Sequence, residues 1–182
     1  MNISSLILKI TGWTVDSGVV PEKKCIILGA PHTSILDFLV AFLYYRSQGG
    51  GKIVKCMVKK DLFVPVLGSI IRAMGGIPVD RKNPTRMVKS VINEMEKKEV
   101  LHLAIAPEGT RKPVKYWKTG FHLIAREAGI PVYLAYFDWG TKHVGYFTKV
   151  ELTDDPKADM ARIQQLYAER HLVGRHPEGY TV

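Results

Sequence analysis

The chain has 182 residues, of which 46% are hydrophobic, so it has the length of one ordinary domain and enough apolar side chains for a substantial core. This composition argues against a disordered chain, and the lack of any repeat argues against a solenoid. The net charge of +9 indicates an anionic partner: a nucleic acid, an acidic membrane surface or a phosphorylated small molecule. Cys25 and Cys56 belong to no CxxC or metal-ligand pattern, which favours a reducing cytoplasm and predicts neither a disulfide framework nor a zinc site.

The first segment, "NISSLILKITGW", has helical spacing. Its apolar residues recur every three or four positions: Ile3, Leu6, Ile7, Ile10 and Trp13. This predicts an amphipathic segment over residues 1–13, which either packs on the domain's own core or contacts a membrane, an alternative favoured by Trp13 and the neighbouring lysine. No apolar run reaches the roughly 20 residues that span a bilayer, and Lys9 interrupts any secretory signal. We therefore expect a soluble or peripheral protein in the cytoplasm, on the inner face of the membrane.

From residue 23 onward, apolar runs rich in β-branched residues alternate with helical patterns. Strands are expected at 23–30, 52–60, 76–80, 100–106, 130–137 and 143–152. Helices are expected at 34–47, 65–75, 83–98, 120–129 and 157–170. This alternation predicts one α/β domain over residues 1–182, with helices flanking a mixed, mostly parallel sheet. The apolar stretch "LFVPVLGSII" either lines an acyl channel or packs in the core, and core packing is the simpler expectation.

Three polar loops follow predicted strands: "APHTS", "GGIPVDRKNP" and "APEGTRKP". Because ligands gather where the strands of such sheets end, we expect these loops to meet at one rim. In the third loop, Gly109 permits a positive φ, the amides beside Thr110 can cradle an anion, and Arg111 offers a planar fork to phosphate. The related "HPEGY" at 176–180 follows a polar tail and is expected to be a surface turn.

His32 and Asp37 lie five positions apart across the first of these loops. The stretch from Ser34 to Asp37 fits a capping box, so the carboxylate has a structural role open to it as well as a role as the partner of His32. We expect both roles to be possible for that first helical turn, although not at the same moment. For Arg81 two roles stay open, a salt bridge with Asp80 and a ligand to phosphate.

The blocks "PHTSILD", "GGIPVDR", "APEGTR" and "GIPVYL", in this order over residues 25 to 137, resemble those of the glycerolipid acyltransferase family, which includes glycerol-phosphate and lysophosphatidate acyltransferases. The resemblance implies that family's fold, His32 as general base and Asp37 as the residue that orients it. It places the acceptor against Arg81, Glu108, Gly109, Thr110 and Arg111, with "GIPVYL" mainly structural. It implies an acyl thioester donor, carried by CoA or acyl carrier protein, a lysolipid acceptor such as 1-acylglycerol-3-phosphate, and no metal or other cofactor.

The chemistry agrees with this resemblance. A thioester is already activated, so the enzyme needs only a base that takes the proton of the attacking hydroxyl, and histidine, with an ordinary pKa of about 6.5, suits that task. Other functions remain open: acylation of a lysolipid that contains an amino acid, hydrolysis of the thioester, or binding of anionic lipid or nucleic acid without catalysis. Nucleic acid is disfavoured as a partner because the Lys and Arg residues are scattered and no binding motif is present.

Overall fold

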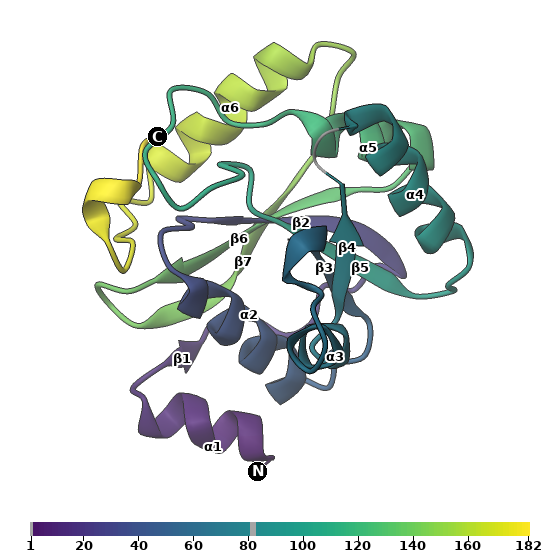
Figure 1. The fold of residues 1–182 in the computed structure, drawn as a ribbon. Helices are drawn as coiled ribbons and strands as arrows, with labels where there is room; N and C mark the ends of the chain where they lie inside the picture. Colours follow the sequence, from purple (N-terminus) through teal and green to yellow (C-terminus); the bar gives the residue numbers. More distant parts are fainter. Residues whose placement is uncertain (1, 81–82) are drawn as a thin grey trace.

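The computed structural model describes residues 2–80 and 83–182 and contains a seven-stranded sheet in the order β1-β7-β6-β2-β5-β3-β4 (Figure 1). The strands are β1 (Thr14–Val15), β2 (Lys24–Ala30), β3 (Val54–Lys59), β4 (Gly76–Val79), β5 (Leu101–Ile105), β6 (Val132–Asp138) and β7 (His143–Val150). Only the β6–β7 pair among these strands is antiparallel. The predicted α/β fold with a mixed, mostly parallel sheet is therefore confirmed.

Helices lie on both faces of the sheet. They are α1 (Ile3–Ile10), α2 (Ile35–Ser47), α3 (Leu67–Ala73), α4 (Pro84–Glu96), α5 (Gly120–Ala128) and α6 (Pro156–Ala168), with short 3-10 helices η1 (Lys60–Leu62) and η2 (Pro177–Gly179). Successive side chains of a strand point to opposite faces, so Cys25 and Ile27 of β2 pack with α1 and α2, whereas Ile26 and Leu28 pack with α4, α5 and α6. Figure 1 shows these two layers below and above the sheet.

The N-terminal helix is shorter than the amphipathic segment predicted for residues 1–13. It begins after Asn2, whose side chain accepts a hydrogen bond from the Ser5 amide at 2.9 Å, and it buries Leu8 while leaving Ile3 and Ile10 exposed. Trp13 lies beyond the helix, is only 7% exposed and packs edge-to-face on Trp139, with 5.0 Å between ring centroids. Of the two alternatives for this segment, Trp13 therefore fits packing on the domain's own core.

The stretch "LFVPVLGSII" is not packed in the core as expected. It forms η1, a loop and α3, at the edge of the sheet beside β3 and β4, and α3 buries only Gly68. Val66 and Ile70 are 75% and 52% exposed. An apolar sequence alone predicts burial, but this short connection lies outside both helical layers and therefore presents its apolar side chains to the surface.

The order of the strands determines which loops meet. β2 lies between β5 and β6 and is parallel to both, so the residues that follow these three strands gather at one edge of the sheet. These residues include His32, Glu108 and Trp139. β4 is separated from β5 by β3, and Arg81, which follows β4, lies outside the described residues. No helix in the described part of the chain is long and apolar enough to cross a bilayer.

Candidate active site

The loop after β2 brings together the two residues that the sequence proposes for catalysis. His32 Nδ1 lies 3.3 Å from Asp37 Oδ2; the imidazole is 22% exposed, whereas the carboxylate is fully buried. Because Nδ1 faces the carboxylate, Nε2 is the ring nitrogen available to a substrate. Such a pair can hold one tautomer, accept a proton at Nε2 and stabilise the imidazolium that results.

Asp37 is held in place from both of its oxygens. Oδ2 accepts the backbone amides of Thr33 at 2.8 Å and Ser34 at 2.7 Å, which completes the predicted capping box at the start of α2. Oδ1 accepts the indole N–H of Trp139 at 2.7 Å. The expectation that capping and pairing with His32 exclude each other is wrong, because the same oxygen that caps the helix also lies nearest to Nδ1.

Glu108 joins the second loop to the first. Its Oε1 accepts the backbone amide of His32 at 2.7 Å, and the side chain is only 2% exposed. Burial raises the pKa of this carboxyl to about 7, although the hydrogen bond from His32 opposes the shift. Its other oxygen, Oε2, and the hydroxyl of Tyr180 are the two buried side-chain atoms without a hydrogen-bond partner in the described structure. A protonatable group therefore lies directly behind the His32 backbone.

The residues that follow Glu108 in the "APEGTR" loop come to the surface, whereas Pro107 before it is buried. Gly109 has a φ of 70°, which confirms the positive φ predicted for it. A Cβ at this position would lie 3.2 Å from the Lys118 side chain. Thr110 and Arg111 are exposed. The structure thus gathers His32, Asp37, Glu108, Gly109 and the two exposed residues at one edge of the sheet.

The C-terminal segment is packed against both loops. The turn predicted for "HPEGY" is present as η2, with His176, Pro177 and Glu178 exposed, but its packing through Gly179 was not predicted. The Thr33 hydroxyl accepts the His176 amide at 3.1 Å. A Cβ at Gly179 would lie 3.0 Å from the Arg111 carbonyl oxygen and 3.3 Å from a Thr33 methyl, so only glycine fits there without a shift. The sequence motif alone does not show this packing, because the partners are some seventy and more residues away.

Tyr180 lies within the electrostatic reach of the site. Burial, followed by the charge of Glu108, raises the pKa of the Tyr180 hydroxyl. The ring packs on Trp117, whose indole N–H donates to the Thr181 carbonyl at 3.0 Å. The last residues of the chain are therefore packed in place near Glu108.

Trp139 is the site residue that the sequence analysis missed. It follows β6, and its backbone amide donates to the Val173 carbonyl at 2.8 Å. Lys142 and Arg175 lie over its indole ring, 4.2 Å and 4.8 Å from the centroid. Its position could have indicated a role, because Trp139 is the first residue after β6, a buried strand that pairs with β2.

A cavity of about 450 Å³ opens where β3 and β4 end, next in sequence to Arg81. Its lining combines basic, acidic and apolar side chains: Lys59, Lys60, Asp61, Phe63, Val64, Val79 and Asp80. Neither His32 nor Glu108 lines it. Among the described residues, no group of three or more His, Cys, Asp or Glu side chains is placed to hold a metal ion.

Comparison with known proteins agrees with this geometry. No curated protein matches the chain closely. A family model described as acyltransferase matches residues 14–138, which include the His32, Asp37 and Glu108 blocks and end one residue before Trp139. The match covers more than half of the sequence. The chain therefore belongs to the acyltransferase family, the family of glycerolipid and lysophosphatidate acyltransferases.

Proposed function

We propose that the protein moves a fatty acyl group from an acyl thioester to a hydroxyl of a lysolipid, with His32 as the general base. The observation behind this proposal is that Nδ1 of the partly exposed His32 imidazole lies 3.3 Å from the buried carboxylate of Asp37. Nε2 takes the proton as the hydroxyl oxygen attacks the thioester carbon, and the imidazolium returns it to the departing thiolate. Asp37 stabilises the charge on the ring between these steps.

We infer a direct transfer because no described residue at the site is suited to carry the acyl group. Burial raises the pKa of both thiols, Cys25 and Cys56, to about 12, so neither is a thiolate near neutral pH. Neither cysteine lies in the site loops. The Ser34 hydroxyl accepts the Leu36 amide at 3.2 Å as part of the helix cap. The histidine therefore acts on the substrate hydroxyl itself.

For the acceptor, we propose 1-acylglycerol-3-phosphate, held by the Gly109–Arg111 loop and by Arg81, with a lysolipid that contains an amino acid as the alternative. The exposed guanidinium of Arg111 suits the two oxygens of a phosphate, and the cavity beside Asp80 offers Lys59 and Lys60 next to apolar side chains. The substitution Arg111→Lys keeps the charge but removes the fork, so it is expected to raise the acceptor KM about tenfold. An unchanged KM would mean that Arg111 does not bind the acceptor and has a structural role.

The test of the proposed function incubates the purified protein with labelled acyl-CoA or acyl-acyl carrier protein and a lysolipid extract. Mass spectrometry of the lipids then identifies the acceptor, and the donor that turns over identifies the carrier. We expect a labelled diacyl product that disappears in His32→Ala. Release of free fatty acid that is unaffected by the lysolipids would instead show a thioesterase, and no turnover of either donor would contradict an enzymatic role.

We also propose that the protein works as a peripheral protein on the inner face of the membrane, because both proposed substrates have acyl chains that partition into lipid. The two free cysteines fit a reducing cytoplasm. The N-terminal helix supports this placement through the exposed side chains of Ile3 and Ile10. A flotation assay with vesicles measures this association without any turnover.

A further inference from the structure

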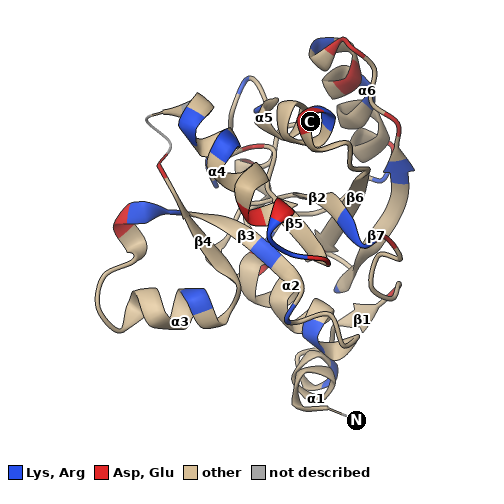
Figure 2. Cartoon of the chain, turned by 90° about the vertical axis from the view of Figure 1, so that its right-hand side faces the viewer, with Lys and Arg blue, Asp and Glu red and all other residues tan. Residues whose placement is uncertain are grey.

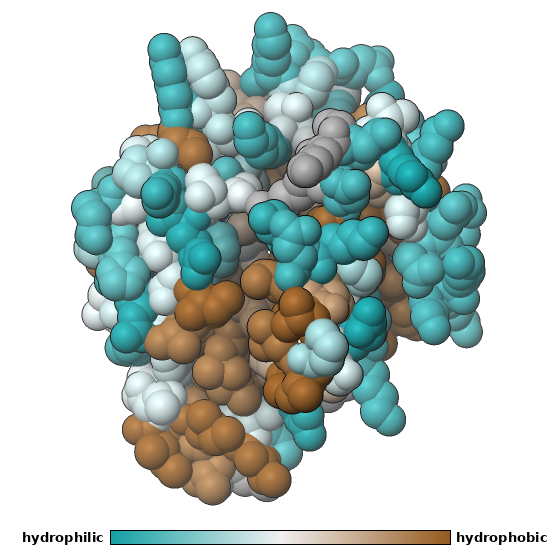
Figure 3. Space-filling model, in the orientation of Figure 1, coloured by the Kyte–Doolittle hydropathy of each residue, from teal (hydrophilic) through white to brown (hydrophobic). Residues whose placement is uncertain are grey.

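Exposed apolar side chains gather on one face of the molecule (Figure 3). We define this apolar face by the large hydrophobic residues that are exposed on α1, on the first turns of α2 and on the segment from η1 to α3. They are Ile3, Leu6, Ile7, Ile10, Ile35, Leu39, Leu62, Val64, Val66, Leu67 and Ile70. Figure 3 shows the brown side chains running from α1 at the bottom of the view, over α2, to α3.

The apolar face is distinct from scattered surface hydrophobics. Eleven of the sixteen large hydrophobic residues exposed in the described structure belong to it, and the other five lie at least seven residues apart from one another along the chain. Contiguous apolar surface of this kind marks a binding surface in soluble proteins. The apolar face is not a part of the core left uncovered, because helices already cover both faces of the sheet.

The charges around the apolar face indicate its partner. Residues 1–13 and 31–80, which supply the three helices, contain seven basic residues and three acidic ones. Of the acids, Asp37 is buried and Asp61 pairs with Lys59 at 2.6 Å. The basic residues are Lys9, Arg46, Lys52, Lys55, Lys59, Lys60 and Arg72. Each of α1, α2 and α3 has a basic residue in its last turn, seen as blue segments in Figure 2. Apolar side chains bordered by cations are suited to a lipid surface with anionic headgroups.

The apolar face also extends to the catalytic loop. Ile35 is the first residue of α2 and follows Ser34 directly, so one exposed apolar side chain lies three positions from His32. At the other end, Val64 lines the cavity beside β3 and β4. A lipid surface against this face would therefore lie next to both regions that the proposed function uses.

We propose that the apolar face docks on a bilayer that contains anionic lipids, with η1 and α3 as a second contact beside α1. This inference deepens the proposed function, because a docked face delivers the lysolipid to the His32 loop while its acyl chain stays in the membrane. It also changes the role of α1, which becomes one of two contacts instead of the sole anchor. Docking through two separated contacts fixes the orientation of the site toward the lipid.

The conformation of Val66 guides the choice of variant. Its φ is 67°, a region that is costly for a β-branched residue, and its side chain is 75% exposed. Its ψ of −65° places it in the strained γ-turn region. Aspartate has one branch fewer at Cβ than valine, so Val66→Asp adds a charge without adding bulk at Cβ. Paired with Ile70→Asp, it charges the α3 part of the face. The matched variant Ile3→Asp with Ile10→Asp charges the α1 part.

The test is flotation of the full chain with vesicles of phosphatidylcholine alone or mixed with phosphatidylglycerol, with no thioester present. We expect binding that requires phosphatidylglycerol and that falls on the order of tenfold in each double variant. The control, Leu123→Asp, charges an exposed leucine of α5 in the opposite layer and should bind as the unmodified protein does. Unchanged circular dichroism and melting temperature confirm that each variant is folded.

Three outcomes would overturn the proposal. If the α3 variant floats as well as the unmodified protein, α3 is no lipid contact. If the unmodified protein does not float, the face has no affinity for this bilayer. If sedimentation shows a dimer that Val66→Asp with Ile70→Asp dissociates, the face binds a second copy instead. Because no substrate is used, failure of the enzymatic proposal leaves these outcomes unaffected, and turnover of both donors is measured separately.

Discussion

Two buried carboxylates are paired with histidine in the part of the chain that the structure describes, one on each side of the sheet. His32 Nδ1 lies 3.3 Å from Asp37 Oδ2, and His122 Nε2 lies 3.0 Å from Asp159 Oδ2. By distance alone the second pair is the better one. Their surroundings differ, however, and the difference indicates which pair can act on a substrate.

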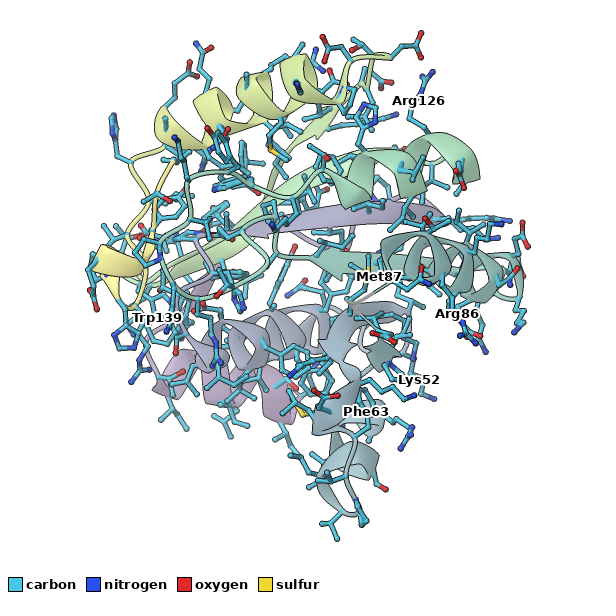
Figure 4. All side chains as sticks on the ribbon, turned by 45° about the horizontal axis from the view of Figure 1, so that its top comes forward. Lys52, Phe63, Arg86, Met87, Arg126 and Trp139 are labelled. Carbon is cyan, nitrogen blue, oxygen red and sulfur yellow. The ribbon has the colours of Figure 1, made fainter. Side chains whose placement is uncertain are left out.

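The second pair is closed in by its neighbours. The His122 side chain is 8% exposed against 22% for His32. Asp159 also accepts the Thr153 amide at 2.7 Å and pairs with Arg162 at 2.8 Å, so it ties the loop after β7 to α5 and α6. In Figure 4, Arg126, which lines the same surface cavity as His122, and Trp139, which holds Asp37, lie far apart.

A short contact between histidine and a carboxylate does not distinguish the two pairs, whereas their surroundings do. The first pair lies on a loop at the carboxyl end of a central strand, where parallel neighbours bring further polar groups. The second pair lies between α5 and α6, and its hydrogen bonds hold these helices and the loop after β7 together. We therefore expect changes at the first pair to affect turnover and changes at the second to affect stability.

The largest expected effect is the loss of transfer in His32→Ala. Without a base at this position kcat should fall by about 10⁴-fold or more, to the limit of detection, while the melting temperature changes little. His122→Ala should instead lower the free energy of unfolding by about 3 kcal/mol and leave the activity of the folded fraction largely intact. Urea denaturation and initial rates measure both quantities. Equal losses of activity in the two variants would contradict the distinction.

The next largest effect is expected for Asp37→Asn, which nearly preserves the shape and can still cap α2. It removes the charge that favours the imidazolium, so kcat should fall on the order of 10⁴-fold. Asp159→Asn is the matched change, and it should cost about 2 kcal/mol of stability with little effect on kcat. Near-normal turnover in Asp37→Asn would mean that this carboxylate is only a helix cap.

A smaller effect, about tenfold in kcat, is expected for Trp139→Phe, which removes the donor to Asp37 Oδ1 but keeps a ring. The acceptor KM should stay constant. The charged carboxylate loses a hydrogen bond, so the loss should fall on kcat alone, a split that a purely structural role would not cause. Trp13→Phe is the control, since Trp13 packs on the same ring but makes no hydrogen bond to Asp37 in the described structure. Equal kcat values in the two variants would remove the positioning role.

The last prediction concerns stability instead of turnover, and it rests on Glu108, the buried carboxyl behind the His32 loop. Its folded-state pKa of about 7 lies above the ordinary value of 4.5, so the folded state keeps a proton that the unfolded state has released. Stability should therefore decrease as the pH rises from 4.5 to 7. Glu108→Gln keeps an acceptor for the His32 amide and should lessen that decrease by up to about 3 kcal/mol, measured by urea denaturation. Parallel pH profiles of the two proteins would show that burial does not raise this pKa.

The sequence was sufficient for the features that depend on local patterns. The alternation of strands and helices, the capping box at Ser34 and the positive φ of Gly109 all follow from residues that are close in sequence. The convergence of the His32 and Glu108 loops followed from the general rule that parallel strands end at one edge. The structure then showed the β2–β5 pairing that this convergence requires.

The remaining features depend on contacts between distant residues. Trp139 reaches Asp37 only because β6 pairs with β2, and the C-terminal segment reaches Thr33 across more than 140 residues. The exposure of Val66 and Ile70 was missed for another reason: hydrophobicity measures the preference for leaving water and does not show whether the partner is the core or another surface. The order of the strands and the path of each connection determine which distant residues meet and which apolar side chains stay exposed.

If His32 takes the proton of the acceptor hydroxyl in a direct transfer, no acyl group is ever carried by the protein, and the mass of the protein can be measured during turnover. The purified protein is mixed with an acyl thioester, first without and then with the lysolipid acceptor, and its intact mass is followed by rapid-quench mass spectrometry. We predict an unchanged protein mass at every time point and formation of the acylated lipid only after the acceptor is added. A protein species heavier by one acyl group, formed without acceptor and consumed when acceptor is added, would contradict the account.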